Sequence, residues 1–218
     1  MTEIQEKSGK TLSSFSLRLL ELFPAYGLPG DPALVSRMDS YYQELLEWNS
    51  RFNLTRITGE EEAAVFHFLD SAVAWPYLPS QGPILDIGSG AGFPGLVLAL
   101  LSSERPVTLL EVSAKKAGFL RHMCQHLKLD QVTVLEEPWP LAPSRKERYA
   151  ALCSRATFSG LHRFAGAEKF LVPEGRIIVW RGQGVGTLPG LVNRSIPVTL
   201  PGQRGARCLL IGERGKKV

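Results

Sequence analysis

The 218-residue sequence contains only three cysteines and no apolar run approaching the ~20 residues that a membrane helix needs. Cys124, Cys153 and Cys208 lie far apart, with neither the spacing of a disulfide framework nor that of a zinc site. The polar start, MTEIQEKSGK, has no apolar segment of the signal-peptide type. We therefore expect a cytoplasmic globular protein with reduced thiols and no membrane contact.

Acidic residues are scarce in the last third of the chain. Residues 141–218 carry 14 Lys and Arg against 4 Asp and Glu, whereas residues 1–140 carry 11 against 17, so the net charge of +4 conceals a strong asymmetry. Lys and Arg neutralise phosphates and release counterions, which is what binding to nucleic acid requires. The alternative is that these side chains only keep exposed loops solvated.

The first eighty residues show helical patterns and no strand pattern. Apolar residues recur at helical spacing over 12–23. Asp31 is a good N-cap, followed by proline, for a helix that runs to about Trp48. Residues 59–78 are again helical, in one or two pieces. These patterns predict an all-helical extension over residues 1–80.

From residue 81 the pattern changes to strands that alternate with helices. We expect strands at 83–88, 106–112, 131–136, 149–154, 175–180, 195–200 and 206–212. Helices are expected from Pro94, over 113–127 and over about 158–171. The last two strands, joined by PGQRG, should form a hairpin. The domain at 81–218 is therefore predicted to be α/β and Rossmann-like, with a seven-stranded, mostly parallel sheet.

Glycine is concentrated where the first predicted strand ends, in ILDIGSGAGFPG at 84–95. Three glycines stand there at alternate positions, Gly88, Gly90 and Gly92. They permit a sharp turn and the close approach of a ligand, and the next helix directs its N–H groups to the same place. Glu111 ends the second strand, 25 residues after Asp86, where a carboxylate can accept both hydroxyls of a ribose.

Two kinds of ligand compete for this turn. Gly90-x-Gly92-x-x-Gly95 also matches the dinucleotide fingerprint, with Glu111 about 20 residues further on. A dinucleotide sets a pyrophosphate against the turn, which Asp86 would repel, whereas S-adenosylmethionine brings an ammonium that a carboxylate attracts. The charge therefore favours S-adenosylmethionine and a methyltransferase over an NAD-type oxidoreductase, with a turn that binds nothing as a third interpretation.

Five segments make the comparison with known families specific: WNSRFNLTRIT at 48–58, HFLDS at 67–71, LDIGSGAGFPG at 85–95, LLEVSAKKAGFL at 109–120 and SRA at 154–156. Over about residues 41–181 the sequence resembles the RsmG (GidB) family. Members of this family are bacterial methyltransferases of the small-subunit (16S) ribosomal RNA that act on a guanine N7. The resemblance implies a class I methyltransferase fold, S-adenosyl-L-methionine as methyl donor, and 16S rRNA or the small ribosomal subunit as partner.

The resemblance also implies site residues. On the cofactor side it implies Gly88 and Phe93 in the turn, Leu135 and Glu136 after the third strand, and Arg155 after the fourth. Together with the residues read from the turn, the expected cofactor-binding set is Asp86, Gly88, Gly90, Gly92, Phe93, Glu111, Leu135, Glu136 and Arg155. The expected substrate contacts are His67, Asp70, Arg155 and Arg181.

Three positions depart from the usual pattern of the family. Val134 stands where the family usually has an Arg, directly before the pair at 135–136. Ala150 stands where the fourth strand usually has an Asp. Arg181-Gly182 replaces a usual Lys-Gly. Arginine keeps the charge and the phosphate affinity of lysine but not its geometry. The departures therefore bear on the RNA contacts more than on the cofactor.

No catalytic acid or base is expected. Guanine N7 has an in-plane lone pair and loses no proton on methylation, so the protein needs to position donor and acceptor and exclude water. Local chemistry leaves other interpretations open for the substrate contacts. His67 and Asp70, three apart on a helix, can bond one another, and Arg155 can be an exposed loop residue. Asn53 and Thr55 can contact RNA or only shape a turn between helices.

A metal is not expected either. His122 and His126 are spaced as a helical ligand pair, but the sequence offers no third ligand nearby, so we interpret them as a solvated helix face. Lys115 and Lys116 are interpreted in the same way, with phosphate contact as the alternative. We expect a monomer, because the sequence has no large apolar stripe. A non-catalytic RNA-binding module remains the second alternative to a methyltransferase.

Overall fold

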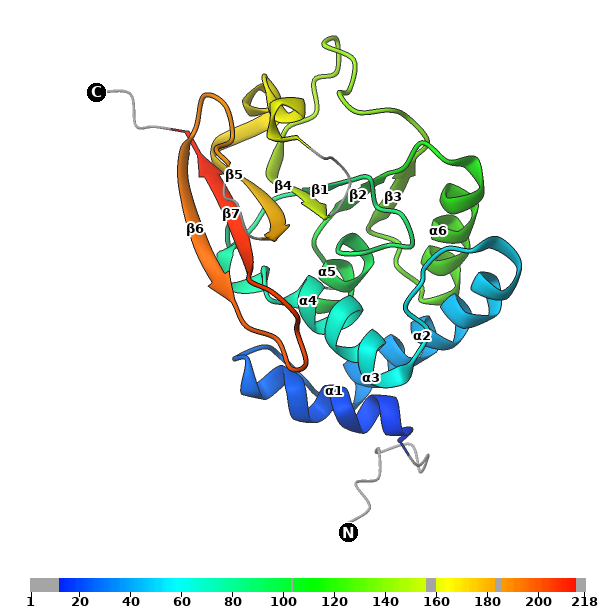
Figure 1. The fold of residues 1–218 in the computed structure, drawn as a ribbon. Helices are drawn as coiled ribbons and strands as arrows, with labels where there is room; N and C mark the ends of the chain where they lie inside the picture. Colours follow the sequence, from blue (N-terminus) through cyan, green and yellow to red (C-terminus); the bar gives the residue numbers. More distant parts are fainter. Residues whose placement is uncertain (1–11, 103, 156–159, 183–185, 215–218) are drawn as a thin grey trace.

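One mixed sheet organises the part of the chain that the computed structural model describes, which is residues 12–102, 104–155, 160–182 and 186–214 (Figure 1). Its strands are β1 (Ile84–Ile87), β2 (Val107–Leu110), β3 (Val132–Leu135), β4 (Tyr149–Arg155), β5 (Leu171–Gly182), β6 (Val192–Val198) and β7 (Arg207–Glu213). They lie in the order β3-β2-β1-β4-β5-β7-β6. β1 to β5 are parallel, and β7 runs antiparallel to both β5 and β6. The seven-stranded, mostly parallel sheet and its closing hairpin are confirmed.

Most of the helices precede the sheet, and the first two begin at side-chain caps. They are α1 (Ser14–Ala25), α2 (Pro32–Phe52), α3 (Glu60–Ala63), α4 (Asp70–Ala72), α5 (Gly95–Leu101) and α6 (Ala114–His126), with a π-helical turn η1 (Ala64–Leu69) and a 3-10 turn η2 (Trp75–Tyr77). Asp31 accepts a hydrogen bond from the Leu34 N–H at 3.0 Å, as the N-cap interpretation requires. Asn53 ends α2 with a left-handed backbone, φ 50°.

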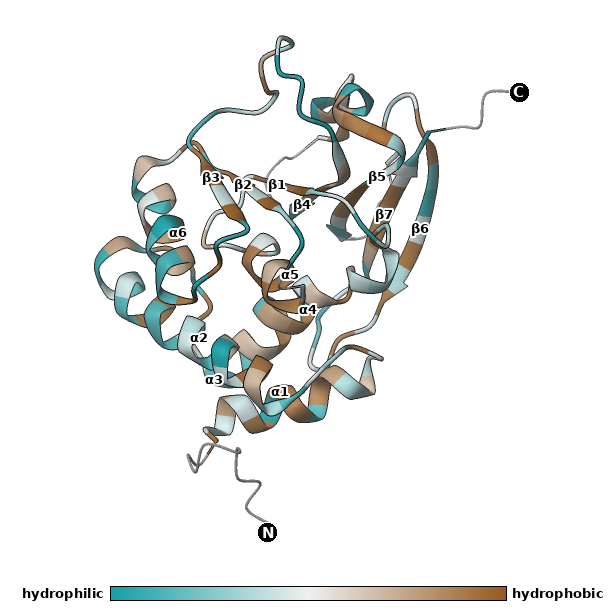
Figure 2. Cartoon of the chain, turned by 180° about the vertical axis from the view of Figure 1, so that it is seen from behind, coloured by the Kyte–Doolittle hydropathy of each residue, from teal (hydrophilic) through white to brown (hydrophobic). Residues whose placement is uncertain are grey.

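The helices gather on one face of the sheet (Figure 1). A large hydrophobic cluster there joins α1, α2 and α4 to α5, α6 and the strands; Phe15 of α1, for example, stacks on Tyr42 of α2 with ring centroids 4.4 Å apart. Figure 2 shows apolar residues concentrated in α5 and the central strands, with more polar residues on the outer sides of α2 and α6. The helical extension thus shares a core with the sheet.

The opposite face of the sheet is covered by irregular segments, and one prediction was wrong there. Within the described part of the expected helix at 158–171, the chain forms two 3-10 turns, η3 (Leu161–Phe164) and η4 (Ala167–Phe170), and β5 begins at Leu171. The buried residues in these turns recur every three positions, as Leu161, Phe164, Ala167 and Phe170. A 3-10 turn places that spacing on one side, and Gly166, with φ 78°, separates the two turns. Residues 158 and 159 lie outside the described residues.

Candidate functional site

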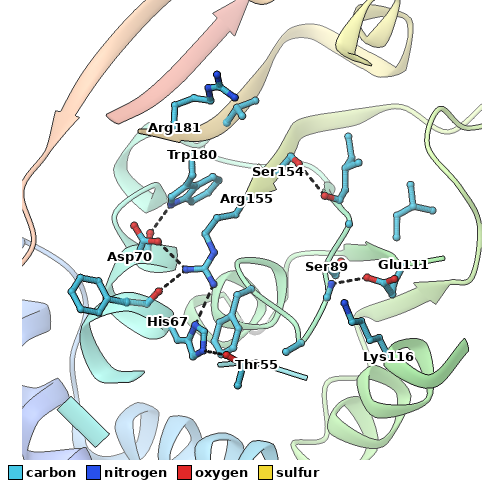
Figure 3. Close-up of a pocket in the computed structure, with 18 of the residues that line it drawn as sticks. Thr55, His67, Asp70, Ser89, Glu111, Lys116, Ser154, Arg155, Trp180 and Arg181 are labelled. Carbon is cyan, nitrogen blue, oxygen red and sulfur yellow. Dashed lines mark hydrogen bonds and ion pairs between the residues drawn. The ribbon is translucent and has the colours of Figure 1, made fainter. Parts of the chain in front are cut away.

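A large pocket lies at the carboxyl ends of the parallel strands β1, β2, β4 and β5 (Figure 3). This is the edge at which ligands bind in open α/β sheets. The pocket has a volume of about 1360 Å³, which exceeds the ~300–1,000 Å³ typical of a site for one small molecule. It therefore has room for a cofactor together with part of a second substrate.

The glycine-rich turn forms the floor of the pocket beside β1. Gly88, Gly90 and Gly92 all have positive φ angles, of 73°, 58° and 97°, which residues with side chains rarely adopt. A Cβ atom on Gly92 would lie 2.4 Å from the Cδ1 atom of Leu96. Tyr41 of α2 donates a hydrogen bond to the carbonyl of Ala91, which ties the turn to the helical extension. These glycines are therefore required by the backbone path itself.

Asp86 supports this turn from beneath. Its side chain is fully buried, does not line the pocket, and accepts a hydrogen bond from the Gly95 N–H at 3.0 Å. Burial raises its pKa to about 7, against the lowering effect of hydrogen bonds from Ser89 and Gly95. The charge that favoured S-adenosylmethionine in the sequence interpretation is thus behind the turn and only partly present at neutral pH.

Glu111 stands on the pocket wall directly after β2. One carboxylate oxygen accepts a hydrogen bond from the Gly90 N–H and the other from the Ser113 N–H, each at 2.8 Å. Each oxygen keeps a further lone pair for a ligand hydroxyl. Val112, the next residue, also lines the pocket, and its large apolar side chain is 68% exposed. It was not singled out from the sequence. This pairing of an acceptor with an apolar surface suits a nucleoside.

The two glutamates that follow β3, Glu136 and Glu137, face different surroundings. Glu136, the expected cofactor residue, forms an ion pair with Arg121 of α6 at 3.0 Å and does not line the pocket, and neither does Leu135. Glu137 does line the pocket, together with Trp139. Adjacent side chains in an extended segment point to opposite sides, so only one of two neighbouring glutamates can face a given site. Nothing in the sequence distinguishes the two.

Across the pocket from the turn, ion pairs join three segments that are distant in the sequence, and Figure 3 shows the pair of Asp70 and Arg155. Arg155, at the end of β4, donates to Asp70 Oδ2 at 2.8 Å and to the Phe66 carbonyl at 2.7 Å. Arg207 of β7 donates to the same Asp70 oxygen at 2.7 Å. Asp70 is 2% exposed, and its Oδ1 atom has no hydrogen-bond partner among the described residues. Arg207 was not anticipated, because no local pattern marks it.

His67 lies between this ion-pair cluster and the turn. Its Nδ1 atom is 3.4 Å from an Arg155 guanidinium nitrogen, and its Nε2 atom is 2.8 Å from the Thr55 hydroxyl. Burial, followed by the charge of Arg155, lowers the pKa of His67 to about 3, so the ring is neutral. Because a guanidinium only donates, Nδ1 is the acceptor and Nε2–H donates to Thr55. The two expected substrate residues His67 and Asp70 therefore meet through Arg155.

Phe93 joins the two sides of the pocket. It stacks on His67 with centroids 4.3 Å apart and an angle of 9° between the rings, and on Tyr41 at 5.1 Å. The Arg155 guanidinium lies 5.3 Å from the same ring. Phe93 is 5% exposed. It therefore positions His67 and Arg155 against the turn as well as lining the pocket.

Basic side chains surround the pocket mouth. Arg181, at the end of β5, lines the pocket, and its Nε atom has no hydrogen-bond partner among the described residues. Three further arginines of the lining, Arg163, Arg204 and Arg207, were not expected from the sequence. Lys116 also lines the pocket, whereas Lys115 lies 5.4 Å from the Phe52 ring. Thr55 reaches the pocket, and Asn53 is absent from its lining.

Comparison with known proteins bears on both sequence and fold. The model of the GidB family, described as rRNA small subunit methyltransferase G, matches residues 34–187. The chain is 38% identical over 205 residues to a ribosomal RNA small subunit methyltransferase G of Roseiflexus sp. (strain RS-1), covering 84% of this chain and 85% of that protein. The corresponding figures for the protein of the same name in Chloroflexus aggregans are 34% over 212 residues, with 88% and 87% covered.

Solved structures show the same fold in methyltransferases of distant sequence. A methyltransferase from Pyrococcus furiosus superposes with a TM-score of 0.59 at 14% identity, over 83% of this chain and 98% of that one. A precorrin-6y C5,15-methyltransferase from Geobacter metallireducens gives a TM-score of 0.56 at 17% identity, over 66% of this chain and 87% of that one. The Rossmann-like methyltransferase fold is confirmed. Within the described residues, no helix is long and apolar enough to cross a membrane.

Proposed function

Because the chain belongs to the rRNA small subunit methyltransferase G family, we propose that it transfers a methyl group from S-adenosylmethionine to the N7 atom of a guanine in small-subunit (16S) ribosomal RNA. The observation that carries the proposal is one pocket with two different sides. A glycine-rich turn with Glu111 suits a nucleoside cofactor, and a buried ion-pair cluster stands opposite.

The residues of the turn side fit S-adenosylmethionine. Glu111 has free lone pairs for the ribose hydroxyls, and the exposed Val112 offers an apolar surface for the adenine. Glu136 faces Arg121 outside the pocket, whereas Glu137 lines the pocket and pairs through Oε1 with Arg145, so its other oxygen can accept from the exocyclic amine of the adenine. Gly88 and Gly90 leave space for the methionyl part. When bound, the cofactor supplies an electrophilic methyl group on a sulfonium.

The protein's own contribution to the reaction is positioning. Guanine N7 offers an in-plane lone pair and would lose no proton on methylation, so the protein needs no general base. His67, with a pKa of about 3, carries no charge against the purine, which becomes positive. The charge of Arg155 is balanced by Asp70 at 2.8 Å. Holding donor and acceptor in line in this way is a large part of catalysis.

The remaining part of the proposal concerns the partner. The basic residues at the pocket mouth, among them Arg163, Arg181 and Arg204, suit the phosphates that flank a target guanine. We take the substrate to be 16S rRNA or a small-subunit assembly intermediate, which places the protein in the cytoplasm of a bacterium, acting as a monomer.

Methyl transfer to RNA tests this function directly. The protein is incubated with labelled S-adenosylmethionine and small subunits, or naked 16S rRNA, from cells that lack the activity, and the product is mapped. We expect label on one guanine, at N7. Label at a ring carbon or an exocyclic amine would remove the N7 assignment alone. RNA binding without transfer would favour a non-catalytic module, and calorimetric binding of NAD but not S-adenosylmethionine would favour an oxidoreductase.

A further inference from the structure

Two histidines and a glutamate meet on the outside of the molecule, away from the pocket. His122 and His126 lie one turn apart on α6, and Glu44 faces them from α2, which packs against α6 (Figure 1). One oxygen or nitrogen from each residue lies within 4.8 Å of the others. The sequence offered the two histidines without a third ligand. The fold supplies it from a helix about 80 residues earlier.

We propose that Glu44, His122 and His126 form a zinc-binding site that joins the helical extension to the methyltransferase core. Two imidazoles and one carboxylate are a ligand set that zinc uses, with water in the fourth position. Imidazole nitrogens also favour zinc over magnesium or calcium, which prefer oxygen ligands. Among the residues that the structure describes, this is the one group of three such side chains that converge.

The Glu44 carboxylate lies between the two histidines, at hydrogen-bond distance from one and further from the other. Glu44 Oε2 is 2.5 Å from His122 Nε2, whereas Glu44 Oε1 is 3.9 Å from His126 Nδ1. The second separation is too long for a hydrogen bond, yet His126 is turned toward the carboxylate. Tetrahedral zinc with bonds of ~2.0–2.1 Å separates its ligands by about 3.3 Å, which lies between these two values. Zinc binding would replace the contact between Glu44 and His122 and draw His126 inward.

A second layer of contacts already orients His126 for this role. Its other ring nitrogen, Nε2, lies 2.7 Å from the hydroxyl of Ser40 on α2. With Nδ1 on the metal, Nε2 carries the proton and donates to Ser40, which is the usual arrangement behind a metal-bound histidine. The side chains of Glu44, His122 and His126 are 22%, 36% and 34% exposed, so an ion can reach them from solvent.

The site would act on stability and leave the chemistry of the pocket in place. Tyr41, one turn before Glu44 on α2, holds the glycine-rich turn through Ala91. At its other end, α6 begins beside Glu111. A zinc ion between α2 and α6 would therefore fix the spacing of two elements that support the turn, at a distance from the reacting groups.

The test uses protein without a histidine tag, stripped of metal with a chelator and titrated with zinc chloride by calorimetry. We expect one zinc ion per chain and a rise in Tm of roughly 5–10 °C at a hundredfold excess over Kd. Cobalt should give the visible absorption of a tetrahedral site. His126→Ala and Glu44→Gln should abolish the binding of zinc and the cobalt absorption. Ser40→Ala should weaken zinc binding by about tenfold.

His162→Ala is the matched control, because the chain has four histidines and His162 is exposed on the far side, in η3. It should keep full zinc affinity. Should zinc bind equally to the wild type and to His126→Ala, or not bind the folded wild type at all, the site is overturned and the cluster is an interhelical hydrogen bond only. Methyl transfer is not a readout here, so the outcome is independent of the proposed function.

Discussion

The two sides of the pocket are built in opposite ways. On the turn side, defined by Gly88, Gly90 and Glu111, the contacts are between a side chain and the backbone within one β-α-β unit. On the ion-pair side, defined by Asp70, Arg155 and Arg207, the contacts are between charged side chains; Arg155 and Asp70 are 85 residues apart in the sequence. A local motif can specify the first kind of site, whereas the second exists only once the whole sheet has formed.

This difference predicts separate consequences of mutation. A change on the turn side should alter the affinity for the cofactor and leave the fold largely intact, because the backbone there is held by many neighbouring contacts. A change on the ion-pair side should alter stability and transfer together, because breaking a buried pair leaves an uncompensated charge.

The largest effect is expected for Arg155→Ala. The variant loses the hydrogen bonds to Asp70 and to the Phe66 carbonyl, but the buried Asp70 keeps Arg207 as an ion-pair partner, so the free energy of unfolding should fall by about 2–3 kcal/mol, as measured by urea denaturation. Arg121→Ala is the control, because its pair with Glu136 is 49% and 38% exposed and should contribute less than about 1 kcal/mol. Equal losses in the two variants would show that the cluster at Asp70 is not a stabilising unit.

Gly88→Asp should have the next largest effect, on the other side. Aspartate adopts the left-handed backbone of φ 73° more readily than most residues, so the fold should be kept, with Tm lowered by only a few degrees through backbone strain of about 1–2 kcal/mol. Its side chain would occupy the space that we assign to the cofactor, and calorimetry should show at least about a hundredfold lower affinity for S-adenosylmethionine. Gly118→Asp, on α6 with nothing within 4 Å of its Cβ position, should bind normally. Unchanged binding by Gly88→Asp would mean that the cofactor lies elsewhere.

The sequence supported much of the fold and only part of the site. Alternating strand and helix patterns predicted the sheet, and the positive φ angles explain why glycine is needed at 88, 90 and 92. The helix expected at 158–171 failed, because a period of three and a period of 3.6 differ little over so short a stretch. Glu136 and Glu137 could not be told apart, and Glu44, like Arg207, is marked by no motif, because its neighbours come from distant segments.

Glu111→Gln should have a smaller effect, which also sharpens the assignment of the acidic residues. Glutamine keeps one acceptor oxygen and loses the other, so the affinity for S-adenosylmethionine should fall by about tenfold. Glu136→Gln should leave the affinity unchanged, since that side chain faces Arg121. The reverse ranking of the two variants would restore Glu136 to the cofactor site and remove Glu111 from it.

His67 and Asp86 should make the free energy of unfolding depend on pH in opposite directions. Folding lowers the pKa of His67 from 6.5 to about 3. Its neutral ring therefore contributes fully to stability above pH 6.5, and this contribution is lost as the pH falls toward 3. Asp86, with its pKa raised from 3.8 to about 7, contributes below pH 3.8, and its contribution is lost as the pH rises to 7. Between pH 3.8 and 6.5 the two contributions to the free energy of unfolding therefore largely offset each other.

Removing one of the two groups should reveal the pH dependence that the other gives to the free energy of unfolding. Urea denaturation between pH 4.5 and 7 measures it. His67→Gln should become less stable as the pH rises, and Asp86→Asn more stable. Parallel curves for both variants and the wild type would contradict the assigned shifts.

Asp70→Asn, assayed for binding and transfer in the same preparation, tests the two-sided pocket most directly. Asparagine keeps the shape of the side chain but removes the charge that Arg155 and Arg207 share. We predict affinity for S-adenosylmethionine within about threefold of the wild type, and methyl transfer to 16S rRNA reduced by at least about a hundredfold. Cofactor affinity that falls as far as transfer, or transfer at the wild-type rate, would contradict the division of the pocket into a cofactor side and a substrate side.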